Sequence, residues 1–496
     1  MLVKTRRLLV YRLVLCGALV SCAIAPTSAN GQGRSALADL NGHLPRALNV
    51  PSDRIWVIAP LPTGLGVRRW SAATGWSGWN PNHPGPAGVL VTNWSESLAA
   101  TYTEDPRPTV GGFVRGPQVN AVYGYLDNAR AVVGVAVSLW DQGALGGPLW
   151  IHSLSTLIPP TTQPVDSFRA ASGFGWYERA GPRVNVFGSS LYQDLGRAGI
   201  TSTLRELFSN GTTWNFNDHG RPAYPGHEQV LIGPNSTVWD NRTKSGFVFV
   251  TLEETATATN SRDAPSPNLW LRQFGPAPTT TWQWIDLGNP YALRGTTFVT
   301  CNTGNRAVCA RGMRAPVAVA RYEGELLKIH VFVLVLRQTT QAPTNRQWVL
   351  WERHFDGSRW RRWVDHGPFP ATVPVLARPQ DPWQISPGPQ PPFDLTSGVA
   401  YDQNGTLKVN LFGTTRDGRL MEYFWTGQRW QYGFNVPGPA EGSFRTISSA
   451  VHDSASFDFI TIVGRVTGPV ASAGEVWEYY WDSRVNQNWA WRRLFP

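Results

Sequence analysis

A short segment recurs along the chain and constrains the fold more than any other feature. Each copy begins with Leu or Val, carries aromatic residues within the next six positions, and is followed by a Trp ten to thirteen positions after its first residue. Good copies begin at 204, 269, 350, 420 and 476, a looser one at 65, and a degenerate one without the second Trp at 149. Self-similarity at a regular spacing, here about 68 residues, is the signature of a repeat architecture.

The residues around each copy have the pattern of short strands. Alternating apolar runs precede the copies, as at 183–187, 328–332 and 407–412, and a Gly turn closes each unit. A further short strand that ends in an acidic turn lies upstream, so each unit contains four strands. Four such strands cannot bury both faces alone, whereas sheets packed around an axis can. The sequence therefore predicts an all-β fold, a seven-bladed β-propeller of four-stranded antiparallel blades over 48–496, although a rod-like stack of sheets suits the same repeats.

Composition excludes several other classes of protein. Gly (49) and Pro (39) are too frequent for a helical bundle or coiled coil, and 42% hydrophobic residues are too many for a disordered chain. Twenty-four Trp residues indicate core anchors or ligand-stacking surfaces. We expect most of the repeated Trp residues to anchor one blade against the next.

The first residues have the features of an export signal. Basic residues accompany an apolar run at 8–20, which is too short to span a bilayer. Residues 1–29 are thus expected to be a signal peptide, with cleavage after Ala29, and 30–47 an N-terminal extension. The segment Leu19-Val20-Ser21-Cys22 also resembles a lipobox, which would place a lipid on Cys22. Both alternatives predict an exported protein, secreted or periplasmic, that meets a membrane only through such a lipid.

Charge and cysteine content narrow the partners. The balance of 44 basic and 34 acidic residues gives +10, which falls to +6 without the four basic residues of the leader. Arg is scattered and Lys is rare, so no nucleic-acid partner is expected. Cys301 and Cys309 lie close together in a loop and are expected to form a disulfide. Too few ligands accompany them for zinc, and no metal or cofactor is expected.

One unit resembles a known family. The segment 407–430, with its apolar strand, Asp-Gly hairpin, Leu-led aromatic strand and Gly-x-x-Trp turn, is similar to a blade of the bacterial propeller lectins of the Photorhabdus type. It is more loosely similar to the fungal fucose-binding propeller lectins. The likeness is close only in the units around 352, 422 and 478. In the fungal lectins, sites between blades use an Arg, a Glu on the next strand and aromatic residues under the sugar.

This resemblance implies a set of glycan-binding residues. A carboxylate beside an aromatic face suits a sugar, which has an apolar face and a polar rim. The alternative is that the repeated Glu residues are polar positions on the solvent face of an outer strand. We also expect Asp218, Asp286 and Asp365 to cap turns, and His219 and His366 to pack rather than bind metal. The implied ligand-binding residues are Glu206, Glu352, Glu422, Glu478, Trp351, Trp425, Trp477, Arg183, Lys328 and Lys408.

Two functions are consistent with these features. The first is an exported, lectin-like propeller with several weak glycan sites between blades, whose useful affinity comes from avidity. The second is a polysaccharide-degrading enzyme, a glycoside hydrolase or lyase, with one cleft built by insertions such as 252–267 and 374–392. The sequence has no nucleophile elbow, P-loop, zinc helix or dinucleotide fingerprint, which favours the lectin. A scaffold for protein partners is a third possibility.

Overall fold

A computed structural model gives the fold. The expected leader and extension up to residue 45, including Cys22, lie outside the described residues, and so does Cys301. The domain limits, the export signal and the disulfide therefore stay predictions. The structure describes residues 46–50, 54–61, 64–77, 94–103, 118–126, 132–141, 148–153, 168–178, 181–194, 199–209, 214–222, 229–254, 268–275, 281–291, 308–314, 316–339, 342–368, 393–403, 405–415, 417–453, 457–485 and 488–495.

The described residues form β-strands joined by hairpins. The strands of the first half are β1 (Arg46–Val50), β2 (Arg54–Leu61), β3 (Gly64–Ser71), β4 (Gly75–Trp76), β5 (Trp94–Thr103), β6 (Gln118–Leu126), β7 (Val132–Asp141), β8 (Pro148–Ser153), β9 (Phe168–Glu178), β10 (Gly181–Asp194), β11 (Gly199–Ser209), β12 (Trp214–Gly220), β13 (Gln229–Asp240) and β14 (Ser245–Glu254). The remaining strands are β15 (Asn268–Phe274), β16 (Trp282–Gly288), β17 (Val308–Met313), β18 (Val317–Glu323), β19 (Leu326–Thr339), β20 (Ala342–Phe355), β21 (Val364–Pro368), β22 (Phe393–Gln403), β23 (Thr406–Thr415), β24 (Leu420–Trp425), β25 (Trp430–Val436), β26 (Ser443–Asp453), β27 (Asp458–Thr467), β28 (Val476–Asp482) and β29 (Ala490–Phe495). A short 3-10 turn, Pro439–Glu441, precedes β26.

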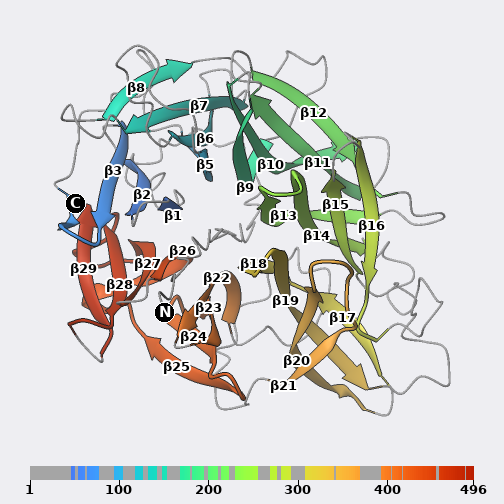
Figure 1. The fold of residues 1–496 in the computed structure, drawn as a ribbon. Helices are drawn as coiled ribbons and strands as arrows, with labels where there is room; N and C mark the ends of the chain where they lie inside the picture. Colours follow the sequence, from blue (N-terminus) through green and yellow to red (C-terminus); the bar gives the residue numbers. More distant parts are fainter. Residues whose placement is uncertain are drawn as a thin grey trace, which may run out of the picture.

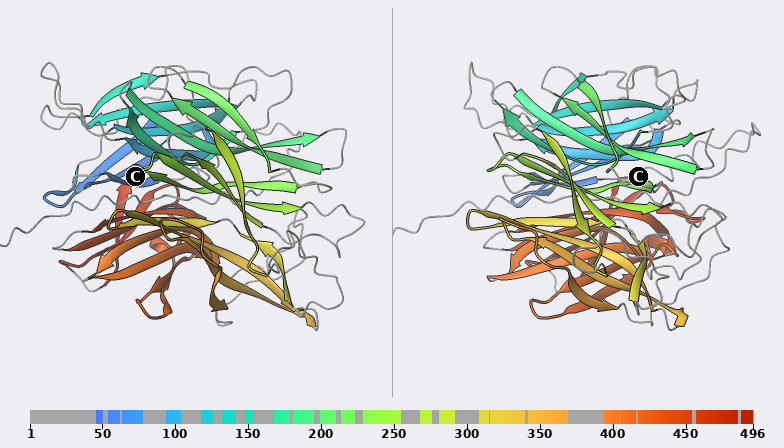
Figure 2. Two further views of the ribbon diagram at one scale, coloured as in Figure 1. Left: turned by 45° about the vertical axis from the view of Figure 1, so that its right-hand side comes forward. Right: turned by 90° about the vertical axis from the view of Figure 1, so that its right-hand side faces the viewer.

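The strands form antiparallel sheets, each built from consecutive strands, that surround a central axis (Figure 1). Their innermost strands contact one another in the order β1, β5, β9, β13, β18, β22, β26 and back to β1. The side views show the twist of these sheets (Figure 2). The expected all-β propeller of antiparallel blades is therefore confirmed, and the ring, not the rod-like stack, is the arrangement found.

The prediction of seven equivalent four-stranded blades is wrong. Among the described residues there are six four-stranded blades, and the remaining sheet, β17–β21, has five strands because both β17 and β18 pair with β19. Its inner strand is interrupted before Pro316, which has no N–H to continue the ladder. The repeat count also fails at one position. Six copies of the repeat begin on the strand next to the outermost strand of their sheet, whereas the copy at Leu149 lies on β8, the outermost strand.

The repeated Trp residues join one blade to the next, as the sequence predicts. A Trp at or shortly before the beginning of an outer strand stands edge-on against a Phe of the preceding blade. The ring centroids are 5.4 to 6.1 Å apart and the interplanar angles are 69 to 80°, which is the favourable T-shaped geometry. The four pairs are Trp282 with Phe187, Trp360 with Phe249, Trp430 with Phe332, and Trp489 with Phe412.

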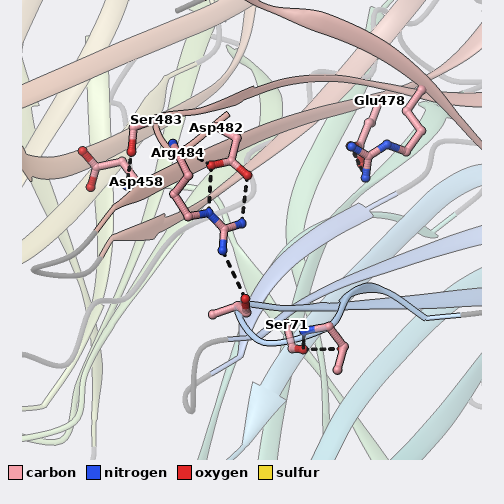
Figure 3. A network of polar contacts seen from close by, with 9 residues as sticks. Ser71, Asp458, Glu478, Asp482, Ser483 and Arg484 are labelled. Atoms are coloured by element: carbon pink, nitrogen blue, oxygen red, sulfur yellow. Dashed lines mark hydrogen bonds and ion pairs between the residues drawn. The ribbon is translucent and has the colours of Figure 1, made fainter. Parts of the chain in front are cut away.

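The ring closes by side-chain packing between the β26–β29 and β1–β4 blades, and each of these sheets, as far as the structure describes them, is built from consecutive strands. Trp70 stacks on Phe459 with centroids 4.3 Å apart. Arg484, held by two hydrogen bonds to Asp482, donates from Nη1 to the carbonyl oxygen of Ala72 at 3.2 Å (Figure 3). Among the described residues, no helix is long and apolar enough to cross a membrane.

Candidate functional site

The four repeated Glu residues are buried between blades. Their exposed fractions are 2% for Glu206, 9% for Glu352, 4% for Glu422 and 0% for Glu478. The idea that they lie on a solvent face is therefore wrong. Each is on the third strand of its blade, and its register partner on the second strand is Phe187, Phe332, Phe412 or Val463. Three of these partners are the Phe residues that the next blade's Trp covers. The Glu residues therefore face the seams, the interfaces between consecutive blades.

In the seam after the β9–β12 blade, polar partners surround Glu206. Asn185 donates to its Oε1, and Asn217 donates to Oε2 at 3.3 Å. His219 Nε2 lies 3.0 Å from Oε2. From the next blade, Arg272 contributes Nε at 3.4 Å from His219 Nδ1, and its guanidinium lies 5.1 Å from the centre of the Trp284 ring. This carboxylate is fully enclosed by its partners.

The histidine seam, between the β17–β21 and β22–β25 blades, is more open. His330 Nδ1 donates to Glu352 Oε1 at 2.6 Å, and His366 Nε2 donates to Oε2 at 2.7 Å. His354 Nδ1 lies 3.9 Å from Oε1. Burial alone would raise the pKa of Glu352, but the hydrogen bonds and charges of His330 and His366 lower this pKa to about 2. The carboxylate is thus ionised at neutral pH.

The side chains of the histidine seam are partly accessible. The exposed fractions of the side chains are 12% for Glu352, 11% for His366, 18% for His330 and 32% for His354. Burial lowers the pKa of His354, so its imidazole is neutral at pH 7. These groups offer one ionised carboxylate and several imidazole nitrogens to a ligand from one wall of the seam.

The opposite wall of the histidine seam is aromatic. Partly buried Trp425, Trp430 and Tyr432 lie on the β22–β25 blade and pack on the core that it shares with the β17–β21 blade. The Trp425 ring is 6.3 Å from that of His366, and the Trp430 ring is 5.3 Å from it. A polar wall therefore faces an apolar wall across this seam.

The next seam holds an acid with fewer polar partners. Glu422 accepts a hydrogen bond from Asn410 at 2.5 Å, and Tyr479 of the next blade stands near it. Burial raises the pKa of Glu422 to about 7, and the Asn410 bond offsets only part of that effect. This carboxyl is enclosed and close to half-protonated at neutral pH.

Glu478 lies in the seam that closes the ring (Figure 3). Arg492 Nη1 is 3.7 Å from its Oε1. Burial raises the pKa of Glu478 to about 7, while Arg492, Trp76, Arg68 and Thr461 offset part of that rise. Like Glu422, this residue is too enclosed to contact a ligand in this conformation.

The two expected Lys residues bind backbone carbonyls and not the Glu residues. Lys328 Nζ donates to the carbonyl oxygen of Asp356 at 2.5 Å, and Lys408 Nζ donates to that of Thr426 at 2.7 Å. Both Lys residues thus bind the hairpin that follows the third strand. Arg183 is half-buried on β10 and has a partner of its own.

Several Arg residues that the sequence patterns did not predict for the site face acids across seams. Three of them are Arg68, Arg272 and Arg353, and the acids that attract them are Glu478, Glu206 and Asp286. Burial lowers the pKa of each Arg, and the acid offsets part of that. Their signal was present, because each is the fourth residue of a repeat copy that begins with Leu.

The expected aromatic residues divide into two kinds. Trp425 lines the histidine seam. Trp351 instead donates from Nε1 to the hydroxyl of Tyr291 at 3.1 Å, and Trp477 donates to Glu475 at 2.7 Å. Only Trp425 is therefore in a position to stack on a ligand beside one of the repeated Glu residues.

Two minor expectations can be checked directly. Asp218, Asp286 and Asp365 each accept a hydrogen bond from the N–H of the Gly two positions later, at 2.7 to 2.8 Å, so the turn-capping role is confirmed. His219 and His366 also bind Glu carboxylates, which packing alone did not predict. Within the described part of the chain, no group of three or more His, Cys, Asp or Glu residues has the geometry to hold a metal ion.

Comparison with known proteins gives the chain no family. No family model and no curated protein matches it. Among solved structures, a fungal lectin of Aleuria aurantia, a six-bladed β-propeller described with a fucose recognition mode, is 14% identical, with a TM-score of 0.37, over 80% of this chain and 97% of the lectin. The polysaccharide lyase Uly1 is 9% identical, with a TM-score of 0.42, over 95% of this chain and 97% of the lyase.

A third structure, a mutant Trypanosoma rangeli sialidase, is 12% identical with a TM-score of 0.37, over 86% of this chain and 52% of the sialidase. The fungal fucose lectins are thus among the similar structures, whereas the closer resemblance to Photorhabdus-type lectins stays a prediction. Because all three TM-scores are below 0.5, these similarities do not decide which glycan or reaction belongs to this chain.

Proposed function

We propose that this protein is an exported glycan-binding propeller whose principal site is the histidine seam. One observation carries the proposal: the ionised, partly accessible carboxylate of Glu352 stands beside imidazoles on one wall, with the Trp425 ring on the other. A pyranose needs an aromatic surface for its C–H face and charged acceptors or donors for its hydroxyls. This seam supplies both.

The other repeated Glu residues are enclosed between blades and do not form open sites. Glu206, Glu422 and Glu478 are at most 4% exposed, so a sugar cannot reach them without separating two blades. The expectation of several equivalent weak sites is therefore narrowed to one seam. Export remains part of the proposal because of the leader-like residues 1–29, which lie outside the described part of the chain.

A glycan array tests this function directly. The wild-type protein should bind a group of related glycans, and Trp425→Ala should lose that binding because the stacking surface is gone. Trp481 occupies the same position on β28 that Trp425 has on β24, so Trp481→Ala is a matched control on another seam. It should retain binding. An array without hits, or equal loss in both variants with unchanged melting temperatures, would count against the proposal.

A second function, polysaccharide cleavage at the same seam, is favoured by His354. A neutral, partly exposed imidazole next to a carboxylate is suited to act as a general base. Incubation of the protein with mixed plant, algal and bacterial polysaccharides should then release reducing ends, and His354→Ala should abolish the release. No release from any polysaccharide would retire this alternative.

A further inference from the structure

We infer that the glycan of the histidine seam carries an anionic group, either a uronate carboxylate or a sulfate ester. This inference rests on the proposed function and specifies its ligand class. It comes from a cluster of cations at the outer end of the same wall, which we call the arginine rim: Lys328, Arg359 and Arg361.

The register of the hairpin after β20 places the arginine rim on the face of Glu352. Phe355 pairs with Trp360 in this hairpin. The N–H of Asp356 donates to the carbonyl oxygen of Arg359, and the N–H of Arg361 donates to the carbonyl oxygen of His354. Since successive side chains of a strand alternate between faces, His354 and Asp356 share the face of Glu352, and the two Arg residues opposite them share it too. Lys328 lies two residues before His330 on β19 and faces the same way.

Asp356 binds the guanidinium of Arg361 and lies at ion-pair distance from that of Arg359. Arg361 Nε binds Asp356 Oδ2, and Arg359 Nε lies 4.0 Å from the same atom. Asp356 is itself fixed by the N–H of Arg359 at 2.9 Å and by Ser358, and these bonds keep the pKa of its carboxyl well below the usual range. The exposed fractions of the side chains are 70% for Arg359 and 42% for Arg361, so both retain donors that face solvent.

The local charge balance favours an anion. The three cations of the arginine rim face Asp356 and Glu352, and the charge of Glu352 is already offset by hydrogen bonds from two imidazoles. Arg321, the register partner of Lys328, binds Glu323 and lies 3.9 Å from Asp402, so the excess of positive charge is confined to the hairpin after β20. A guanidinium fixed by one carboxylate can present its remaining N–H groups to two oxygens of a carboxylate or sulfate. A sugar stacked on Trp425 would then direct its acidic substituent toward the outer rim of the blade.

The neighbouring blade lacks this arrangement. At the equivalent turn of the β22–β25 blade, Thr426 stands in place of Asp356, and Gln431 stands in place of Arg361, while Arg429 is equivalent to Arg359. The pairing of Trp425 with Trp430 places Arg429 on the face away from the histidine seam. Arg429→Gln is therefore a matched control that removes an exposed Arg without touching the proposed site.

The test measures binding of polygalacturonate, its carboxyl-reduced neutral form, dextran sulfate and dextran by calorimetric titration at low and at high salt. The wild-type protein should bind at least one acidic polymer, and its affinity for that polymer should fall as the salt concentration rises. The double variant Arg359→Gln, Arg361→Gln should bind that polymer about ten-fold more weakly, as expected when one charge-assisted contact is lost. Arg429→Gln should bind as the wild type does. Preference for polygalacturonate identifies the group as a carboxylate, and preference for dextran sulfate identifies it as a sulfate.

The outcomes separate this inference from the proposed function. If neutral glycans bind in a Trp425-dependent way and acidic ones bind no better, the glycan-binding function stands and the inference fails. Equal weakening by the Arg429 control would also overturn it, because the effect would then come from overall charge. If no glycan of either kind binds, both proposals fail. Thermal melting of each variant shows whether the fold is retained.

Discussion

His366 Nε2 donates a hydrogen bond of 2.7 Å to Glu352 Oε2, and this contact distinguishes the histidine seam from the seam that follows it. One blade later, Glu422 occupies the same register position and accepts a hydrogen bond from Asn410 instead. The same residue type in the same place is therefore a permanent anion in one seam and a titrating acid in the next. The two seams should respond to pH in opposite ways.

Glu422 should destabilise the fold as pH rises. Its folded pKa of about 7 lies above the ordinary value of 4.5, so the folded state holds the proton longer than the unfolded chain does. The free energy of unfolding should fall between about pH 4.5 and 7 and then level off, by roughly 3 kcal/mol from this group. Glu422→Gln should remove most of that fall, which urea unfolding at pH 5 and pH 8 would measure. An unchanged pH dependence would contradict the assignment.

Glu352 should behave in the opposite sense. Its folded pKa of about 2 lies below 4.5, so its stabilising contribution is complete above about pH 4.5 and is lost as pH falls toward 2. Glu352→Gln should lower the free energy of unfolding at pH 7 by roughly 3 kcal/mol and have a smaller effect near pH 3. The same urea unfolding series tests this. A Gln variant as stable as the wild type at pH 7 would show that the imidazole contacts contribute little.

Gly433 is required by the carboxyl group of Glu422. A Cβ at this position would overlap Oε2 of Glu422, so Gly433→Ala should destabilise the protein by about 1 to 3 kcal/mol. A double variant with Glu422→Ala should recover part of this loss, because the overlapping group is gone. Thermal melting of the wild type, the two single variants and the double variant provides a double-mutant cycle. Additive effects would mean that the two residues do not contact each other.

The edge-on Trp residues should control the coupling between blades. Trp430→Ala removes the partly buried ring that covers Phe332 and His366 and should cost about 3 kcal/mol, the low end of the range for aromatic residues in a core. Trp425→Ala should cost less, because the Trp425 ring packs less closely on the facing blade: its centroid is 6.3 Å from that of His366, against 5.3 Å for Trp430. Chemical unfolding compares the two. Equal costs would show that Trp425 is as structural as Trp430.

The repeat allowed most of the fold to be predicted from the sequence. The alternating apolar runs, the Gly turns and the Leu-led segments predict the strands of each blade. The Trp that follows each segment after ten to thirteen positions predicts the contacts between blades. The prediction of seven equivalent blades was wrong where single residues depart from the repeat pattern. Pro316 divides an inner strand into β17 and β18, and Leu149 imitates the repeat on an outer strand.

Only part of the candidate site could be predicted from the sequence. The position of Glu352 follows from the repeat, but its partners come from three different strands of one blade, and their convergence depends on register. Lys328 and Lys408 were expected at sugars because of their strand position, whereas hairpin carbonyls take their ammonium groups. The Arg residues that face acids across seams belong to the next blade, and alignment within one repeat does not reveal such a contact.

The most direct test of the central claim is a crystal structure of the protein with the best-binding glycan from the array. We expect a sugar ring against the indole of Trp425, with its hydroxyls within hydrogen-bonding distance of Glu352 or His354. A glycan bound elsewhere on the propeller, with the histidine seam unchanged, would contradict the claim that this seam is the principal site.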